Sequence, residues 1–286
     1  MDLQTFLQQF VNALSLGSLY ALIAIGYTMV YGILRLINFA HGDVFMIGGY
    51  LAFYGISTFV MPWWLAVALA IALTTLFGVG LERAAYRPLR DSPRISIMIS
   101  AIGASFLIEN LAIVLFDARP KAFPVSDFFA ANYVFSGVYV AGISLIIPWV
   151  VHRTKTGMAM RAVSTDIDAA RLMAIDVDRI ISITFAIGSA LAAIGGIMWA
   201  LKYPRLEPLM GIMPGLKCFI AAVVGGIGSI AGAVLGGLLL GFIELMTIAF
   251  LPELTGYKDA FAFVLLIVVL LVKPTGLLGK NQGEKV

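Results

Sequence analysis

Four polar side chains stand close together between two long apolar segments near the start of the chain. Arg35, Asn38, His41 and Asp43 lie within residues 26–49, where glycines are frequent. Polar groups at such a junction are costly unless they meet water, a partner or a substrate. The glycines allow the backbone to approach a neighbour closely or to unwind. A broken helix of this kind is a common way to line a transport path through a membrane.

Residues that enzymes use are sparse in the rest of the chain. His41 and His152 are its two histidines, which excludes a cluster of histidine metal ligands. The sequence has no Gly-x-x-x-x-Gly-Lys-Ser/Thr phosphate loop, and no histidine stands beside a plausible nucleophile. We therefore expect no catalytic residue, no metal site and no cofactor bound by this chain. Any nucleotide that drives the protein must then bind another chain.

The composition is that of an integral membrane protein. Of the 286 residues, 61% are hydrophobic and 12% are charged, whereas ordinary globular domains carry about 25% charged residues. The apolar runs are continuous rather than alternating, which argues against a β-barrel. Basic residues fall between these runs, so the net charge of +3 does not point to nucleic acid. We predict an all-α, polytopic transmembrane helical bundle in membrane lipid, with a single domain over residues 1–286.

The apolar runs approach the length needed to cross a bilayer, which is about 20 residues, and predict eight or nine spans. They cover residues 10–34, 44–60, 62–81, 95–116, 136–151, 180–201, 214–230, 231–251 and 259–273. The run at 44–60 is short and follows the polar break, so we expect a partial or tilted crossing. Small residues four apart, such as Gly237 and Gly241, favour close packing of helices. The uncharged segment 225–229 is a candidate for a re-entrant or broken helix.

The distribution of Lys and Arg predicts the orientation of the chain. Basic residues gather in 82–94, in 152–179 and in the C-terminal tail, and they are fewer in the intervening loops. The positive-inside rule places these three segments in the cytoplasm and the N-terminus outside. Residues 1–10 contain no Lys or Arg, so we expect the first run to be a retained span rather than a cleaved signal peptide.

Three further ionisable residues, Glu109, Lys217 and Glu244, fall within predicted spans. Each is costly in lipid and is expected to face the bundle interior, a partner or water. For Glu109 and Glu244 two interpretations stay open, which are structural pairing between helices and a place on a translocation path. Lys217 is interpreted as a side chain that snorkels to the membrane surface.

The polar segment 152–179 is predicted to be a cytoplasmic loop that contains a short helix. Gly157 is expected to break the chain, and Ser164 or Thr165 to cap a helix that begins near Asp166. An isolated helix of this length is marginal in water, so it needs something to pack against. It is either a connector that lies on its own bundle or a docking element for a partner chain.

Four motifs occur together in the chain. The first is Ile-Asn-Phe-Ala-His-Gly-Asp within 26–49, and the second is Glu-Arg-Ala-Ala-Tyr-Arg-Pro-Leu-Arg at 82–90. Gly-Gly-Ile-Gly-Ser follows at 225–229, and Lys-Asp-Ala-Phe at 258–261 leads to Lys-Pro-Thr-Gly-Leu-Leu-Gly in the tail. In content and order these motifs resemble the LivH-type permeases of branched-chain amino acid ABC importers. The resemblance covers most of the chain.

The resemblance implies a permease subunit of an ATP-driven importer in a bacterial or archaeal cytoplasmic (inner) membrane. Its substrates would be branched-chain or related hydrophobic amino acids, and the chain would form half of the translocation path. The implied partners are a LivM-like second permease, two cytoplasmic ATPase subunits and an extracytoplasmic substrate-binding protein. ATP and Mg would bind the ATPase subunits.

The resemblance and the polar pattern together predict two sets of site residues. The residues expected on the substrate pathway or its gate are Asn38, His41, Asp43, Glu109 and Glu244. For Asn38 and His41, a turn held by internal hydrogen bonds and direct recognition of a free amino acid stay open as alternatives. By position, the resemblance places ATPase coupling at Arg161, Asp166, Asp168, Ala169 and Leu172. Ala174 stands where the family usually has Gly, so a glycine-type helix cap there must be replaced by another ending.

Other functions stay open on the sequence. The same permease family also serves urea and short amides. An ion-coupled secondary transporter would use Asp43, Glu109 or Glu244 as its coupling site, although the long cytoplasmic loop and the lack of clear repeated halves argue against it. A structural membrane scaffold is a third possibility.

Overall fold

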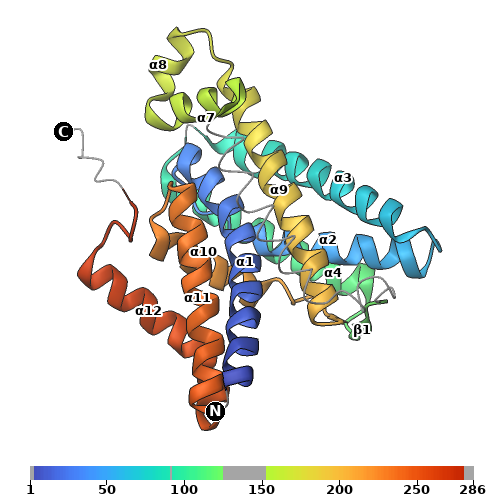
Figure 1. The fold of residues 1–286 in the computed structure, drawn as a ribbon. Helices are drawn as coiled ribbons and strands as arrows, with labels where there is room; N and C mark the ends of the chain where they lie inside the picture. The colour runs from blue at the N-terminus through green and yellow to red at the C-terminus, as the bar shows by residue number, and fades with distance from the viewer. Residues whose placement is uncertain (1–2, 91, 125–152, 280–286) are drawn as a thin grey trace.

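The computed structural model describes residues 3–90, 92–124 and 153–279, which form a bundle of helices with a short two-stranded ribbon (Figure 1). The segments long and apolar enough to cross a membrane within these residues are Leu3–Leu34, Trp63–Leu89, Ile95–Phe116, Val177–Lys202, Ile230–Phe250 and Pro252–Val272. The prediction of a helical membrane bundle is thus confirmed. The predicted span 136–151 lies outside the described residues, so the total of eight or nine spans stays a prediction.

The described elements follow one another in this order along the chain. The helices are α1 (Leu3–Leu34), α2 (His41–Ser57), α3 (Trp63–Leu81), α4 (Arg94–Phe116), α7 (Lys155–Thr165), α8 (Ile167–Leu172), α9 (Val177–Lys202), α10 (Ile212–Gly225), α11 (Ile230–Phe250) and α12 (Lys258–Val272). The short turns are the π-helical η1 (Glu82–Tyr86) and the 3-10 helices η2 (Arg87–Leu89) and η3 (Pro252–Tyr257). Strands β1 (Lys121–Ala122) and β2 (Arg205–Leu206) pair antiparallel, with Lys121 opposite Leu206.

α1 runs through the centre of the bundle, because its middle section is apolar on every side. Residues 16–30 are all buried, and the helix packs against α9, α10 and α11. α11 comes especially close, since its Gly237 and Gly241 lie against the backbone of Ala21 and Gly17. This agrees with the prediction that small residues four apart mediate helix packing.

α2 and α10 begin inside the bundle rather than at its ends. After α1 the chain turns at Arg35, whose φ is 54°, and it returns along α1. α2 therefore starts with His41, whose Nε2 lies 3.3 Å from the carbonyl oxygen of Ile23. α10 starts beside it, and a Cβ atom on Gly42 would lie only 2.6 Å from the carbonyl oxygen of Gly211. Two helix starts meet at this point because glycine leaves room for the backbones to touch.

From this meeting point α2 and α10 lead to different ends of the bundle. The last turns of α2 approach the β ribbon, where Lys121 Nζ donates a hydrogen bond to Tyr54 OH at 2.7 Å. α10 instead leads to the end of α1, since the turn that follows α10 places Gly228 beside Gly32. The run at 44–60, expected to be a partial crossing, is thus a helix that begins within the bundle. The run at 214–230 contains a second such helix, which the sequence did not indicate.

The candidate re-entrant or broken helix at 225–229 is a tight turn between α10 and α11. Gly226 has a φ of 111°, which residues with a side chain rarely adopt. The C-terminal tail closes the end of α10, because the backbone N–H of Leu277 donates to Val224 and that of Leu278 to Gly225, each at 2.8 Å. These hydrogen bonds give the Gly-rich tail motif a structural role, since the last carbonyls of a helix lack partners within it.

α7 and α8 lie together at one end of the molecule, opposite the N-terminus (Figure 1). The predicted break at Gly157 is wrong, because this residue lies inside α7 and its N–H donates to the Oγ1 of the capping Thr154 at 3.1 Å. The predicted caps of α8 are also wrong. Ser164 and Thr165 donate to a backbone carbonyl of α7, while Asp166 accepts from two backbone N–H groups of α8. A carboxylate forms this cap well because it also meets the positive end of the helix dipole.

Candidate functional site

A cavity of about 320 Å³ lies where α2 and α10 begin. α1, α4 and the loop between α1 and α2 form the rest of its wall. Its volume falls in the range of about 300–1,000 Å³ that is usual for small-molecule sites. Gly42 of α2, with Gly211 and Gly215 of the α10 start, leaves both helix starts open to this space. We call it the central cavity.

The polar groups of the central cavity come from three helices. Ser105 Oγ of α4 donates a hydrogen bond to Asp43 Oδ2 of α2 at 2.5 Å. Glu109 lies one turn further along α4, on the same wall, as residues four apart share a helix face. Tyr27 of α1 completes the set. The structure therefore brings together two of the predicted pathway residues, Asp43 and Glu109.

Apolar side chains form most of the remaining wall. They are Ile37, Phe39, Ile102, Phe106, Leu216 and Phe219. Several of them, including Phe106 and Leu216, are partly exposed, so the cavity reaches the side of the bundle between α4 and α10. The site thus combines a few convergent polar groups with an apolar lining, as binding sites for small molecules commonly do.

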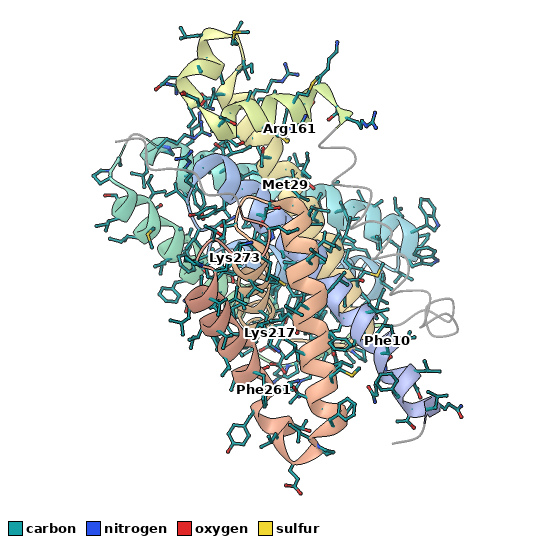
Figure 2. All side chains as sticks on the ribbon, turned by 60° about the vertical axis from the view of Figure 1, so that its left-hand side comes forward. Phe10, Met29, Arg161, Lys217, Phe261 and Lys273 are labelled. Atoms are coloured by element: carbon teal, nitrogen blue, oxygen red, sulfur yellow. The ribbon has the colours of Figure 1, made fainter. Side chains whose placement is uncertain are left out.

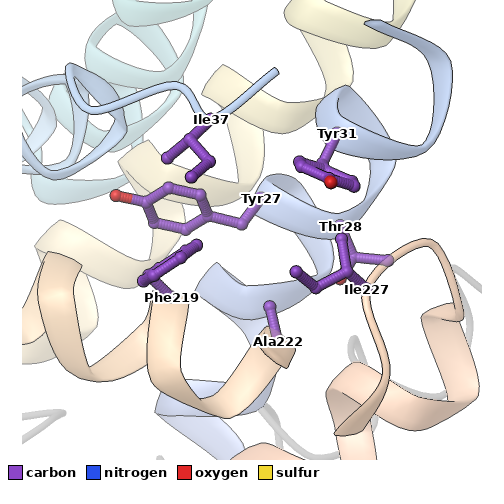
Figure 3. A pocket seen from close by; sticks show the side chains of 7 residues that line it. All are labelled: Tyr27, Thr28, Tyr31, Ile37, Phe219, Ala222 and Ile227. Carbon is purple, nitrogen blue, oxygen red and sulfur yellow. The ribbon is translucent and has the colours of Figure 1, made fainter. Parts of the chain in front are cut away.

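A second, much smaller cavity of about 10 Å³ adjoins the central one. Tyr27, Ile37 and Phe219 line both. Figure 3 shows the ring of Tyr27 between Ile37 and Phe219, with Tyr31 and Ile227 on the far side from its hydroxyl group. These three shared side chains separate the central cavity from a space that extends toward the turn between α10 and α11.

Asn38 and His41 do not belong to the walls of these two cavities. Asn38 is buried, and its Oδ1 accepts a hydrogen bond from Tyr86 OH of η1 at 2.7 Å. The His41 ring is also buried, and it lies against Gly26 with its centroid 4.5 Å from that of Tyr27. These contacts support the interpretation of both residues as parts of a turn held by internal interactions.

Glu244 lies in a buried charge cluster rather than in the central cavity. Its Oε1 is 2.9 Å from Lys217 Nζ, and its Oε2 accepts a hydrogen bond from Tyr20 OH at 2.8 Å. Lys217 Nζ also lies 2.6 Å from Asp259 Oδ1 of α12. Lys258 Nζ, which is half exposed, lies 3.8 Å from Glu244 Oε1. The expected snorkelling of Lys217 is therefore wrong, because the bundle itself supplies its counterions. Figure 2 labels Lys217 among the helices of the bundle.

The motif at 82–90 connects α9 to the loop beside the central cavity. Arg87 Nη2 donates to Asp178 Oδ2 of α9 at 2.5 Å, and Arg90 pairs with both Asp178 and the buried Glu82. The same π-helical turn carries Tyr86, which donates to Asn38. Polar contacts thus join the start of α9 to Glu82 and Arg90, and the backbone of η1 connects them to Tyr86, which holds Asn38 next to Ile37 of the cavity wall.

α8 presents most of its surface to solvent. Of the predicted coupling residues, Arg161, Asp168, Ala169 and Leu172 are exposed, and Asp166 is the cap. The Leu172 side chain is 88% exposed, whereas Ala170 is buried against the bundle. A short helix with an exposed leucine at its tip has the form of a docking element, although it also lies on its own bundle.

α8 ends at Ala174 with a φ of 58°, in the left-handed conformation that glycine usually adopts there. The N–H of Ala174 donates to Arg171, and the N–H of Ile175 donates to Ala170. These two bonds form a Schellman motif. The expectation that alanine requires a different ending is wrong, because the hydrogen bonds hold its backbone in the strained region.

Among residues 3–90, 92–124 and 153–279, no group of three or more His, Cys, Asp or Glu side chains is placed to hold a metal ion. Cys218 is buried and free. The absence of a metal site from the whole chain therefore stays a prediction.

Comparison with known proteins identifies relatives over the whole chain. A family model described as "Branched-chain amino acid transport system / permease component" matches residues 9–270. The high-affinity branched-chain amino acid transport system permease protein BraD of Pseudomonas aeruginosa is 44% identical, with 100% of this chain and 99% of BraD covered. LivH of Escherichia coli K12, of the same description, is 44% identical over 98% of each chain. A chain of PsaBC from Streptococcus pneumoniae, solved in complex with Fab, shares the fold at a TM-score of 0.51 and 13% identity over 92% of this chain.

Proposed function

Because the chain belongs to the family of branched-chain amino acid transport system permease components, we propose that it is the permease subunit of an ATP-driven importer. Its cargo is branched-chain or related hydrophobic amino acids. The observation that carries this proposal is 44% identity, over essentially the full length, to two permeases of high-affinity branched-chain amino acid transport systems. The chain supplies a path through the membrane, and partner subunits bind ATP and Mg and hydrolyse the nucleotide.

The end of the bundle that carries α7 and α8 faces the cytoplasm in this proposal. The basic residues of 82–94 and 153–179 gather at that end, as the positive-inside rule requires of cytoplasmic segments. The C-terminal tail, which closes the end of α10, is then cytoplasmic as well. The described spans, the run at 136–151 and the two helices that begin inside the bundle make up the multi-pass inner-membrane domain.

Three kinds of partner complete the importer. α7 and α8 dock one of two cytoplasmic ATPase subunits. The docking residues are Arg161 of α7, the cap residue Asp166, and Asp168, Ala169 and Leu172 of α8. A LivM-like second permease covers the side of the bundle onto which the central cavity opens. In support, only 6% of the most apolar stretch of Pro252–Val272 is buried within this chain, and only 17% of that of Ile95–Phe116. An extracytoplasmic binding protein delivers the substrate to the opposite end.

Asp43 and Glu109 lie on the path, since both line the central cavity. Asn38 and His41 hold the adjoining loop, through the contacts with Tyr86 and α1. Glu244 acts as a structural pair for Lys217 rather than as a pathway residue, because both are buried together.

Reconstitution of the complete complex in vesicles tests this function. We expect uptake of L-leucine that requires ATP, both ATPase subunits and the binding protein. Uptake driven by a proton or sodium gradient without the ATPase subunits would establish the ion-coupled alternative instead. ATP-dependent uptake of urea or acetamide without uptake of leucine would establish the amide alternative.

A substitution in α8 tests the docking role within the same vesicles. Ala169→Glu places a bulky charge on an exposed helix face and is expected to separate ATP hydrolysis from leucine uptake. Ala169→Ser, which hardly changes the size of the side chain, is the matched control. If Ala169→Glu leaves both uptake and stimulated hydrolysis unchanged, α8 does not dock an ATPase.

A further inference from the structure

Two helix starts point into the central cavity without a cap of their own. α2 and α10 meet there, and neither helix has a side-chain hydrogen bond at its N-cap, which is Ala40 in α2 and Gly211 in α10. In α10 the N–H of Ile212 donates to the Leu209 carbonyl and Pro214 has no N–H, which leaves the N–H of Met213 without a partner among the described residues. This group and the positive end of the helix dipole favour a negative group. At α2 the carboxylate of Asp43, in the first turn, already meets this field. At α10 the first turn has no acidic residue, so its positive end is open to a ligand.

The hydroxyl group of Tyr27 faces the same space. The Tyr27 side chain is only 7% exposed, and among the described residues its hydroxyl group has no hydrogen-bond partner. The phenol ring closes off the small cavity, and its hydroxyl group points away from that cavity (Figure 3). A Cβ atom on Gly215, in the first turns of α10, would lie 3.8 Å from this oxygen. Buried hydroxyl groups normally have a partner, so this group is available to a bound molecule.

The opposite wall carries two carboxyl groups. Asp43 accepts a hydrogen bond from Ser105, and Glu109 has no hydrogen bond or ion pair within the described residues. Among the residues that the structure describes, no Lys, Arg or His side chain lines the cavity. Two carboxylates without a basic neighbour attract a positively charged group. Between the two poles, Ile37, Phe39 and Phe219 supply an apolar surface.

We propose that the central cavity is a transit site that recognises the zwitterion of an aliphatic amino acid. Asp43 and Glu109 receive its ammonium group, and the start of α10 with the Tyr27 hydroxyl group receives its carboxylate. The apolar wall takes the aliphatic side chain. This inference rests on the proposed importer function and assigns to this chain a selectivity of its own, in addition to that of a binding protein. It also separates amino acids from urea and short amides, which lack both charges.

Uptake by the reconstituted complex provides the first test. Glu109→Gln removes one charge from the ammonium side, and Tyr27→Phe removes the hydroxyl group from the carboxylate side. Because a hydrogen bond to a charged group is lost in each case, we expect the leucine transported per ATP hydrolysed to fall about tenfold. Glu253→Gln and Tyr257→Phe make the same chemical changes at exposed positions of η3 and are expected to retain the wild-type ratio.

The outcomes separate this inference from the proposed function. If the wild-type complex shows no ATP-dependent uptake of leucine, the proposed function fails. If the wild type transports leucine while both cavity variants keep its ratio of transport to hydrolysis, only the transit site is wrong. A parallel fall of uptake and hydrolysis would mean that the variants lose assembly, and it would also count against the site.

Protection of a cysteine in the cavity wall gives a second measurement that does not need transport. Leu216→Cys is made in a Cys218→Ala background, which removes the single native cysteine. In the complex without ATP, L-leucine is expected to slow labelling of this cysteine by a thiol reagent. 4-Methylpentanoate, which lacks the ammonium group, and 3-methylbutylamine, which lacks the carboxylate, are expected to protect at least about tenfold more weakly. Equal protection by all three compounds, protection by sodium ions alone, or no protection by leucine overturns the proposal.

Discussion

Lys217 and Glu244 lie side by side inside the bundle, on α10 and α11. Each has further partners, since Glu244 also accepts a hydrogen bond from Tyr20 and Lys217 also meets Asp259. Charges taken out of water are tolerated only when such partners satisfy them. The cluster therefore ties α1, α10, α11 and α12 together at one point and fixes the half-length helix α10 in place.

Lys217→Met is expected to destabilise the protein by about 3–5 kcal/mol, because it leaves the buried Glu244 without its nearest counterion. Thermal unfolding in detergent measures this loss. The same change at Lys258, which is half exposed and 3.8 Å from Glu244, is expected to cost about 1 kcal/mol or less. Adding Glu244→Gln to Lys217→Met should recover much of the loss, and failure to recover it would show that the two charges are not coupled.

The sequence indicated that Glu244 and Lys217 are ionisable residues within spans, but not that the two side chains form a buried ion pair with each other. Glu244 was identified as an ionisable residue in a span, with pairing as one of its interpretations. Lys217 was assigned to the membrane surface because it stands near the end of an apolar run. Nothing in a separation of 27 positions shows that two side chains share a buried site. Tyr27, the unpartnered hydroxyl group in the cavity, was missed for a related reason, since tyrosine within an apolar run also fits ordinary packing.

The end of α8 depends on an alanine in a conformation that suits glycine. A left-handed backbone costs an L-residue roughly 1–2 kcal/mol. Ala174→Gly removes this strain, although glycine also loses about 0.4–1 kcal/mol more conformational freedom on folding. We therefore expect a net stabilisation of α8 by about 0.5 kcal/mol, measured as slower amide hydrogen exchange in residues 167–175.

A second alanine-to-glycine substitution, inside α8, tests whether the effect of glycine on stability depends on its position. Ala169→Gly lies in the interior of α8 and is expected to speed the same exchange, since glycine is about 1 kcal/mol less favourable than alanine there. If Ala174→Gly speeds exchange as much as Ala169→Gly does, the strain at Ala174 is not significant.

The contacts around Asp178 join the end of the molecule that carries α7 and α8 to η1, which holds the loop beside the cavity. Asp178 pairs with Arg87 and Arg90, and η1 next to them holds Asn38 through Tyr86. Because the Asp178 side chain is 46% exposed, its pairs contribute little to stability. Because Asp178 lies at the start of α9, next to α8, we expect these pairs to matter more for coupling α8 to the loop at Ile37 than for stability.

Asp178→Asn is expected to lower the leucine transported per ATP hydrolysed, with a loss of stability of about 1 kcal/mol or less. Asp176→Asn is the control, because it makes the same change of charge two residues earlier. Asp176 caps α9 by accepting from the N–H of Arg179, and asparagine caps a helix equally well. Equal effects of the two substitutions on transport would rule out a specific role for the Asp178 ion pairs.

Elements were predicted best where one apolar run corresponds to one helix. α11 and α12 follow the predicted spans 231–251 and 259–273 closely. The predicted run at 214–230 begins within two residues of α10, but it does not indicate that this start lies inside the bundle, because contact between Gly211 and a glycine of another helix sets that position. The cap of α8 was missed by one or two residues, since Ser164, Thr165 and Asp166 are all good capping residues and only the backbone geometry selects one.

At the scale of the whole molecule, the chain encloses only part of a path. The central cavity opens sideways between α4 and α10, and Tyr27, Ile37 and Phe219 separate it from the smaller cavity. The sequence predicted a break near residues 35–43 and a path beside it, because polar residues and glycines concentrate there. It did not predict that Phe219, almost 180 positions later, closes the same space.

Phe219→Ala is expected to join the two cavities and to make the assembled importer leak. The substitution removes an aromatic ring from the barrier while Tyr27 and Ile37 remain, so the barrier falls only in part. A decrease of about 1.4 kcal/mol in the free-energy barrier to passage would raise the rate of passive leucine efflux about tenfold. Efflux of labelled leucine from preloaded vesicles, with no ATP present, measures the leak. Phe242→Ala removes the same ring from the partly exposed side of α11, where it meets Phe10, and should leave efflux at the wild-type rate. If Phe219→Ala vesicles retain leucine as well as the Phe242→Ala control does, the barrier lies elsewhere in the complex.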